Sequence, residues 1–213
     1  MMRKILLLPA LIVLAGFMLA GCGGYGQVEQ GVVVAVDEKN RTVTIIPQTN
    51  SKNPREYGAY DRLPVEVWNL PEDRSETGAM PDAGLRANVN VKNSTITMYD
   101  PDSKAFDVIQ VEVIEDVTDV DLRRRHPLVT ERHPTTRRWV PKKFPIIDRE
   151  KQTIQIYDLP QKRVTTFRVE EEWKEKYADD WMWNSGCEVR MYFVEKGKSL
   201  RFMNITKTDI TRR

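Results

Sequence analysis

Histidine and cysteine are scarce in this chain, which has two of each among 213 residues. His126 and His133 each lie in an Arg-His-Pro tripeptide, and neither is near Cys187 in the sequence. The chain also has no Gly-x-Ser-x-Gly, His-Glu-x-x-His or phosphate-loop pattern, which are common signatures of catalysis and nucleotide binding. We therefore expect a protein that is not an enzyme and that holds no cofactor.

An excess of charge of one sign is also lacking. Lys and Arg together number 33, and Asp and Glu together number 31. Arg3 and Lys4, at the start of the chain, account for the whole difference. A chain with balanced charges lacks the excess of positive charge that is typical of nucleic-acid-binding proteins, so no nucleic-acid partner is expected. With 30% charged residues, five Trp, seven Tyr and six Phe, the composition is that of a folded and well-solvated protein.

Only one long hydrophobic run is present, from Ile5 to Ala20, directly after the positive Arg3-Lys4 pair. Its length is that of the apolar region of a signal peptide and is short for a membrane-spanning helix. The run ends in Leu19-Ala20-Gly21-Cys22, which resembles the lipobox of bacterial lipoproteins. The resemblance implies a signal peptide over 1–21, cleaved before Cys22, and acylation of Cys22 by covalent lipid. The alternative is an ordinary secretory signal.

The resemblance also implies an address in the cell. Gly23 follows the cysteine, where an Asp would retain such a lipoprotein at the inner membrane of a Gram-negative cell. We therefore expect a protein of the cell envelope, bound to the membrane by its lipid. In a Gram-negative host this is the periplasmic face of the outer membrane. Residues 22–30 then comprise the lipidated cysteine and a flexible tether.

Beyond this tether, short runs with period-two alternation predict a β-rich protein. We expect a first β domain over 31–120, a basic proline-rich linker over 121–143 and a second β domain over 144–213. The expected strands lie at 32–36, 42–45, 63–70, 87–91, 95–99, 106–114, 144–147, 153–157, 163–169, 187–195 and 199–207.

One helix is expected, after the acidic run Glu170-Glu171-Glu172. Trp173, Tyr177 and Trp181 recur every four residues, and the pattern predicts that this stripe packs into the core. In the expected second domain, 144–213, the order of three strands, a helix and two strands resembles an OB fold, a five-stranded Greek-key barrel. We therefore predict an all-β protein with one short helix and two small OB-like barrels, with one larger β-sandwich as the alternative.

The basic segment is a candidate binding site. Guanidinium groups offer fork-shaped donors that suit phosphate or carboxylate. A lipid headgroup, a wall polymer or an acidic partner protein is a fitting ligand, and the alternative is a solvated linker that its charges keep extended. The candidate residues are Arg123, Arg124, Arg125, Arg137 and Arg138.

A second candidate site is a soft-metal site made by Met182, Cys187 and Met191. Thiolate and thioether ligands suit Cu(I). The predicted barrel is similar to small periplasmic copper carriers, which use Met, His and Trp, whereas no His lies near these three residues. The alternative role for the methionines is to fill gaps around the helix.

Taken together, these features predict a lipid-anchored envelope protein that acts as a non-enzymatic binding or scaffold subunit. Its partner is expected to be an envelope protein or a cell-wall component. The alternative function is that of a soft-metal or small-ligand carrier.

Overall fold

The computed structural model describes residues 26–48, 61–158 and 161–208. Strands make up most of its regular structure, with one α-helix and a few short 3-10 helices in the described residues, so the predicted all-β class with little helix is confirmed. The strands are divided among four sheets rather than the two of a sandwich, and none of these sheets closes into a barrel.

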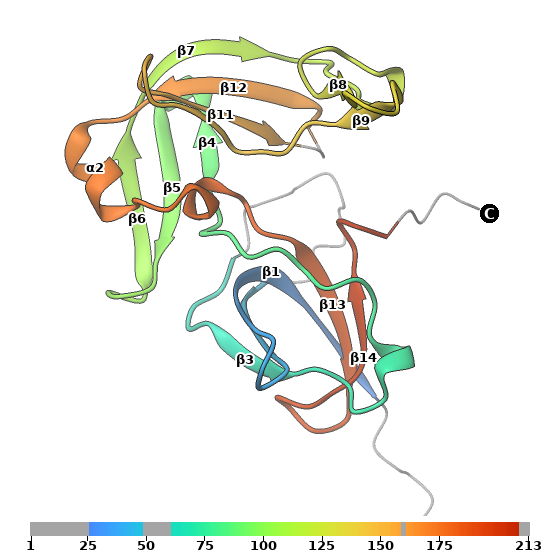
Figure 1. Ribbon diagram of the computed structural model, residues 1–213. Coiled ribbons are helices and arrows are strands. Elements are labelled where there is room, and N and C mark those ends of the chain that lie inside the picture. Colours follow the sequence, from blue (N-terminus) through green and yellow to red (C-terminus); the bar gives the residue numbers. More distant parts are fainter. Residues whose placement is uncertain (1–25, 49–60, 159–160, 209–213) are drawn as a thin grey trace, which may run out of the picture.

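The largest sheet has the order β14-β13-β1-β2-β3 and forms the lower half of the molecule in Figure 1. Its central hairpin was predicted from sequence: the β-branched run of β1 is followed by a turn in which Asn40 N donates to Asp37 Oδ1 over 2.9 Å. All neighbours in this sheet are antiparallel. The strands are β1 (Gln27–Asp37), β2 (Thr42–Pro47), β3 (Glu66–Asn69), β13 (Glu188–Phe193) and β14 (Ser199–Asn204).

The two edges of this sheet approach each other. Isolated parallel bridges join Asn69 to Lys198 and Thr77 to Phe202, so the sheet curls towards closure without forming a continuous ladder between β3 and β14. Its concave face holds a hydrophobic cluster in which Trp68 and Phe193 meet edge to face, with ring centroids 4.7 Å apart. We refer to this five-stranded unit as the curled sheet.

The pairing of β1 with β13 differs from the predicted division into consecutive domains over 31–120 and 144–213. The curled sheet draws its strands from both ends of the described chain, and residues 85–183 lie between them as a large insertion, whereas residues 70–84 pack on the curled sheet itself. The reason lies in β1, where Val33 and Val34 are both buried but in different hydrophobic clusters. Because both faces of β1 are covered, its backbone N–H and C=O groups are shielded from water and need hydrogen-bond partners along both edges. β2 supplies these partners on one edge and β13 on the other.

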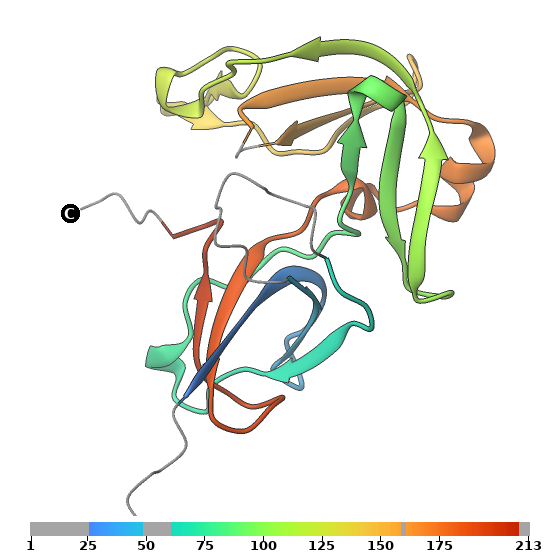
Figure 2. The same cartoon turned by 180° about the vertical axis from the view of Figure 1, so that it is seen from behind.

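The insertion forms the upper half of the molecule (Figures 1 and 2). A three-stranded sheet, β4-β5-β6, lies beside a four-stranded sheet, β10-β11-β12-β7. The strand expected over 106–114 is in fact two strands, because the chain passes from one sheet to the other at the buried Val111. The strands are β4 (Asn88–Asn90), β5 (Thr95–Asp100), β6 (Ala105–Gln110), β7 (Glu112–Val117), β10 (Ile146–Asp148), β11 (Thr153–Asp158) and β12 (Arg163–Arg168).

The predicted helix is shorter than expected. α2 (Glu171–Lys176) ends at Tyr177, and the 3-10 helix η4 (Asp180–Trp183) follows. Tyr177 is buried as predicted, whereas Trp181 is 42% exposed and Trp183 takes the buried place instead. The change of helix type after Tyr177 breaks the four-residue spacing on which the predicted stripe depended. The remaining 3-10 helices are η1 (Arg74–Glu76), η2 (Val91–Asn93) and η3 (Leu122–Arg124).

Candidate functional site

Residues 121–143, which we call the arginine lobe, form a folded projection at one end of the four-stranded sheet. Its two strands, β8 (Thr130–Arg132) and β9 (Trp139–Pro141), pair with each other in antiparallel register. A small hydrophobic cluster containing the buried Val129 and Val164 ties the lobe to β12. The predicted linker is therefore an ordered part of the insertion.

Side-chain acceptors hold the turns of the lobe. Asp121 caps η3 by accepting from Arg123 N over 2.8 Å, and it also pairs with Lys162 Nζ at 2.8 Å. The hydrogen bond from Lys162 is the main cause that lowers the pKa of Asp121. His126 Nδ1 accepts from Leu128 N, and His133 Nδ1 accepts from two backbone N–H groups of the next turn. Both histidines thus act as turn acceptors.

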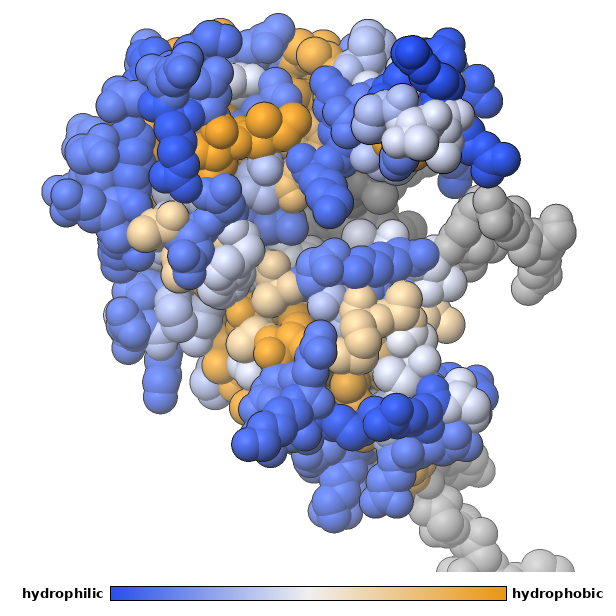
Figure 3. Space-filling model, viewed as in Figure 1, coloured by the Kyte–Doolittle hydropathy of each residue, from blue (hydrophilic) through white to orange (hydrophobic). Residues whose placement is uncertain are grey.

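The five arginines predicted as anion ligands all lie on this lobe, and all are exposed. The lobe contains eight Lys or Arg residues against two acidic ones, an excess of six positive charges within 23 residues. Arg132 stacks over the Trp139 ring, with the guanidinium carbon 4.9 Å from the centroid. Figure 3 shows deep blue, hydrophilic side chains over the β8–β9 region. The arginines are those that the sequence indicated: Arg123, Arg124, Arg125, Arg137 and Arg138.

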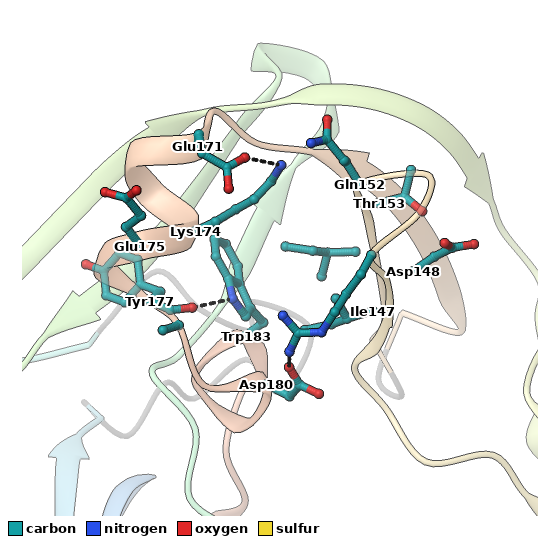
Figure 4. A pocket seen from close by; sticks show the side chains of 13 residues that line it. Ile147, Asp148, Gln152, Thr153, Glu171, Lys174, Glu175, Tyr177, Asp180 and Trp183 are labelled. Atoms are coloured by element: carbon teal, nitrogen blue, oxygen red, sulfur yellow. Dashed lines mark hydrogen bonds and ion pairs between the residues drawn. The ribbon is translucent and has the colours of Figure 1, made fainter.

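A second candidate site is a cavity of about 340 Å³ between the β10–β11 hairpin, α2 and η4 (Figure 4). The buried rings of Tyr177 and Trp183 lie at its base, 5.8 Å apart and edge to face. Trp183 Nε1 donates to the carbonyl oxygen of Tyr177 over 2.9 Å, which fixes the indole. Ile154 adds an apolar wall, and this combination of an apolar base with polar edges is typical of small-molecule sites.

The rim of the cavity carries charges of both signs. Arg149 Nη2 pairs with Asp180 Oδ1 at 3.0 Å, which links the hairpin to η4. Lys174 Nζ pairs with Glu171 Oε2 at 3.1 Å on the helix side. In Figure 4 these helix residues face the hairpin residue Thr153 across the opening. The rim can therefore hold a ligand through its polar groups while the aromatic base takes an apolar part.

A partly buried polar cluster links α2 to β5 and β6. Lys176 Nζ contacts Asp100 Oδ2 at 2.9 Å and Asp107 Oδ2 at 2.6 Å, and Tyr177 Oη donates to the same Asp107 oxygen over 2.6 Å. Burial by itself raises the pKa of Asp100, but the hydrogen bond from Lys176 and those of the following turn outweigh it and lower that pKa to about 2. Desolvation and the Asp107 carboxylate raise the pKa of Tyr177. We call Asp100, Asp107, Lys176 and Tyr177 the polar cluster.

The proposed metal ligands lie in the hydrophobic interior. Cys187 and Met191 belong to the core cluster of the curled sheet, whereas Met182 packs against the cluster of the insertion. Cys187 Sγ accepts a hydrogen bond from Asp82 N over 3.3 Å. Within the part of the chain that the structure describes, no three His, Cys, Asp or Glu side chains are grouped as metal ligands would be.

Cys22 and the whole lipobox lie outside the described residues, so their expected processing stays a prediction. Among the helices within 26–48, 61–158 and 161–208, none has the length and apolar character needed to cross a bilayer. The cavity was missed at the sequence level because its lining comes from three separate segments. Trp183, which is two residues beyond Trp181 and so lies outside the four-residue spacing of Trp173, Tyr177 and Trp181, was the available signal.

The fold and the two candidate sites define an all-β protein with an ordered basic lobe and a small aromatic-based cavity. The chain belongs to a family described as a domain of unknown function, DUF4881, whose model matches residues 24–213. The match includes both ends of the curled sheet and the whole insertion. Comparison with curated proteins gave no match, and comparison with solved structures gave none either.

Proposed function

We propose that this protein is a lipid-anchored envelope protein that acts as a non-enzymatic binding subunit, and that the arginine lobe binds an anionic envelope component. The lipobox-like Leu19-Ala20-Gly21-Cys22 supports the anchor. The ligand is an acidic surface of a partner protein or an anionic wall component. In a Gram-negative host the site of action is the periplasmic face of the outer membrane.

The observation that carries the proposal is that the arginine lobe is folded and not an extended linker. An extended linker would have to lose backbone and side-chain freedom on binding, at about 1–2 kcal/mol for each backbone residue fixed. The lobe is instead held by the β8–β9 pairing, by the Asp121 cap and by the buried Val129. Its arginines are thus displayed before a ligand arrives, which favours binding over the solvated-linker alternative.

The test is co-sedimentation of the chain from Gly23 onwards, which carries no lipid, with isolated envelope fractions at low and high salt. The variant Arg124→Glu with Arg138→Glu reverses two exposed charges of the lobe, one in η3 and one directly before β9. Arg74→Glu with Lys92→Glu is the matched control, because both residues are exposed, lie outside the lobe and change the net charge equally. We expect the lobe variant alone to lose sedimentation. Equal sedimentation of both variants and the wild type at low salt would contradict the proposal.

The cavity favours a second candidate function, that of a small-ligand carrier. Its volume of about 340 Å³ is at the lower end of the range for ligand pockets. The buried Trp183 at its base is a direct reporter, because a ligand in contact with the indole changes its fluorescence. Titration with mixtures of small envelope metabolites, in the wild type and in Trp183→Phe, tests this function. A saturable signal present only in the wild type would support the carrier, whereas no signal with any mixture would argue against it.

A further inference from the structure

Exposed apolar side chains gather at one end of the curled sheet. Val194 and Leu200 flank the β13–β14 turn and are 56% and 52% exposed. Val67, 59% exposed, is next to the same turn, since its carbonyl oxygen lies 3.7 Å from where a Cβ on Gly197 would be. Such a cluster of large apolar side chains in water marks a contact surface. We call these three residues, with the exposed cross-strand neighbours Val28 and Tyr192, the apolar end.

The described chain begins at this same end. Gln27, the first residue of β1, pairs with Phe193, which in turn pairs with Ser199. Gly26 lies so close to the Tyr192 ring that a Cβ there would overlap it, so the chain enters the sheet against the apolar end. Four residue steps separate Gly26 from Cys22, a reach of at most about 14 Å even when fully extended.

The charges of this end are largely compensated. Lys196 Nζ pairs with Glu66 Oε1 at 2.6 Å, and Lys198 Nζ pairs with Glu195 Oε2 at 2.9 Å. The two lysines of the turn therefore contribute little net positive charge. A surface of this kind is suited to the boundary between headgroups and acyl chains, where apolar contact, rather than attraction to anionic lipid, determines binding.

We infer that the apolar end rests on the bilayer that carries the lipid of Cys22, with the side chains of Val67, Val194 and Leu200 at the level of the headgroups. The inference rests on the proposed anchor, because only an acylated Cys22 brings this end within reach of the membrane. It adds an orientation that the anchor alone does not give. The arginine lobe is in the other half of the molecule, away from the start of β1 in both views (Figures 1 and 2). It therefore points away from that bilayer.

The experiment uses the full lipidated protein, purified from cells and reconstituted into phosphatidylcholine vesicles, with and without phosphatidylglycerol. Leu200→Cys and Val194→Cys carry a fluorescent label, and labelling is selective because Cys187 is buried and Cys22 is acylated. Val108→Cys on β6 is the matched control, since Val108 is 63% exposed but belongs to the insertion. Quenching by lipids brominated near the headgroup reports contact to a depth of about 5–10 Å.

We expect both labels at the apolar end to lose fluorescence in brominated vesicles, equally with and without phosphatidylglycerol, and the Val108 label to keep it. Vesicle flotation without quenching at 194 and 200 would overturn the orientation and leave the anchor intact. Failure to float with vesicles would overturn the anchor itself. Disulfide-linked dimers of unlabelled Leu200→Cys, with no quenching of the labelled form, would assign the apolar end to a second copy and overturn the bilayer contact.

Discussion

The polar cluster offers the most direct test of how α2 is held on the insertion. Replacing Lys176 with Met keeps the length of the side chain and removes the cation that lies between Asp100 and Asp107. Asp100 is 4% exposed, so its carboxylate would stay buried beside a second carboxylate with no cation to offset it. Leaving a buried charge unpaired is among the more destabilising effects of a single substitution.

The magnitude follows from the pKa of Asp100, which is lowered from 3.8 to about 2. A difference of this size corresponds to about 2 kcal/mol of stability at neutral pH. Because the following turn also contributes to this shift, we expect Lys176→Met to lower the free energy of unfolding by at most about that amount, which for a chain of this size lowers the melting temperature by up to roughly 4–8 °C. Lys176 is partly exposed, so the loss is smaller than for a fully buried ion pair.

The pH dependence provides the discriminating result. Because the pKa of Asp100 is lower in the folded state than in the unfolded state, its stabilising contribution is complete above pH 3.8 and is lost as the pH falls to about 2. The difference between wild type and Lys176→Met should therefore be full at pH 7 and shrink between pH 4 and pH 2.

Urea unfolding followed by circular dichroism at several pH values measures this difference. Lys174→Met is the matched control: it removes the same charge from the same helix, but Lys174 pairs with the exposed Glu171. We expect the control to change stability by well under about 1 kcal/mol. Equal losses in the two variants, or a loss in Lys176→Met that does not change with pH, would refute the assigned role of the polar cluster.

Three further predictions concern other parts of the molecule. Gly84→Ala should destabilise the fold by about 1–3 kcal/mol, because the added Cβ would lie 2.4 Å from Asn184 O. Gly78→Ala, in which the added Cβ has its nearest contact at 3.3 Å, should lower the melting temperature much less. Cys187→Ser should lower the free energy of unfolding in urea by about 1–2 kcal/mol, because it places a hydroxyl in an apolar core. Stoichiometric Cu(I) binding by the wild type that is lost in this variant would contradict a purely packing role for Cys187. Arg163→Met should lower the free energy of unfolding at pH 7 by about 1–2 kcal/mol, since Arg163 holds the pKa of Asp116 low. If the variant melts at the same temperature as the wild type, this pair contributes nothing to stability.

Local signals predicted the hairpins well. The Asp37–Asn40 turn and the alternation of 153–157 are encoded within a few residues, and both elements are present. The pairing of β1 with β13 is not encoded locally, since it joins segments more than 150 residues apart and depends on how both faces of β1 are covered. Strand patterns specify which residues point inwards, but not which strand lies alongside.

The candidate sites differ in the same way. The arginines of the lobe were evident because they follow one another in the sequence, although the density of proline suggested an extended linker. In the structure, Pro141 ends a short edge strand, where a missing N–H is tolerated, and so it is compatible with the β8–β9 pairing. The cavity could not be assembled from sequence, because Arg149, Lys174 and Asp180 meet only through the packing of α2 against the hairpin.

The pairing of β1 with β13 has a consequence for how the chain reaches its folded state. The first described strand has no second neighbour until residues 188–193 are available, so the curled sheet closes only after nearly the whole polypeptide has emerged. Contacts of such large sequence separation slow folding. If the chain crosses a membrane N-terminus first, β1 reaches the far side with its valines exposed and one backbone edge unpaired. We therefore expect a chaperone on that side to bind the incomplete chain, which a protein with only short-range strand pairing would not need.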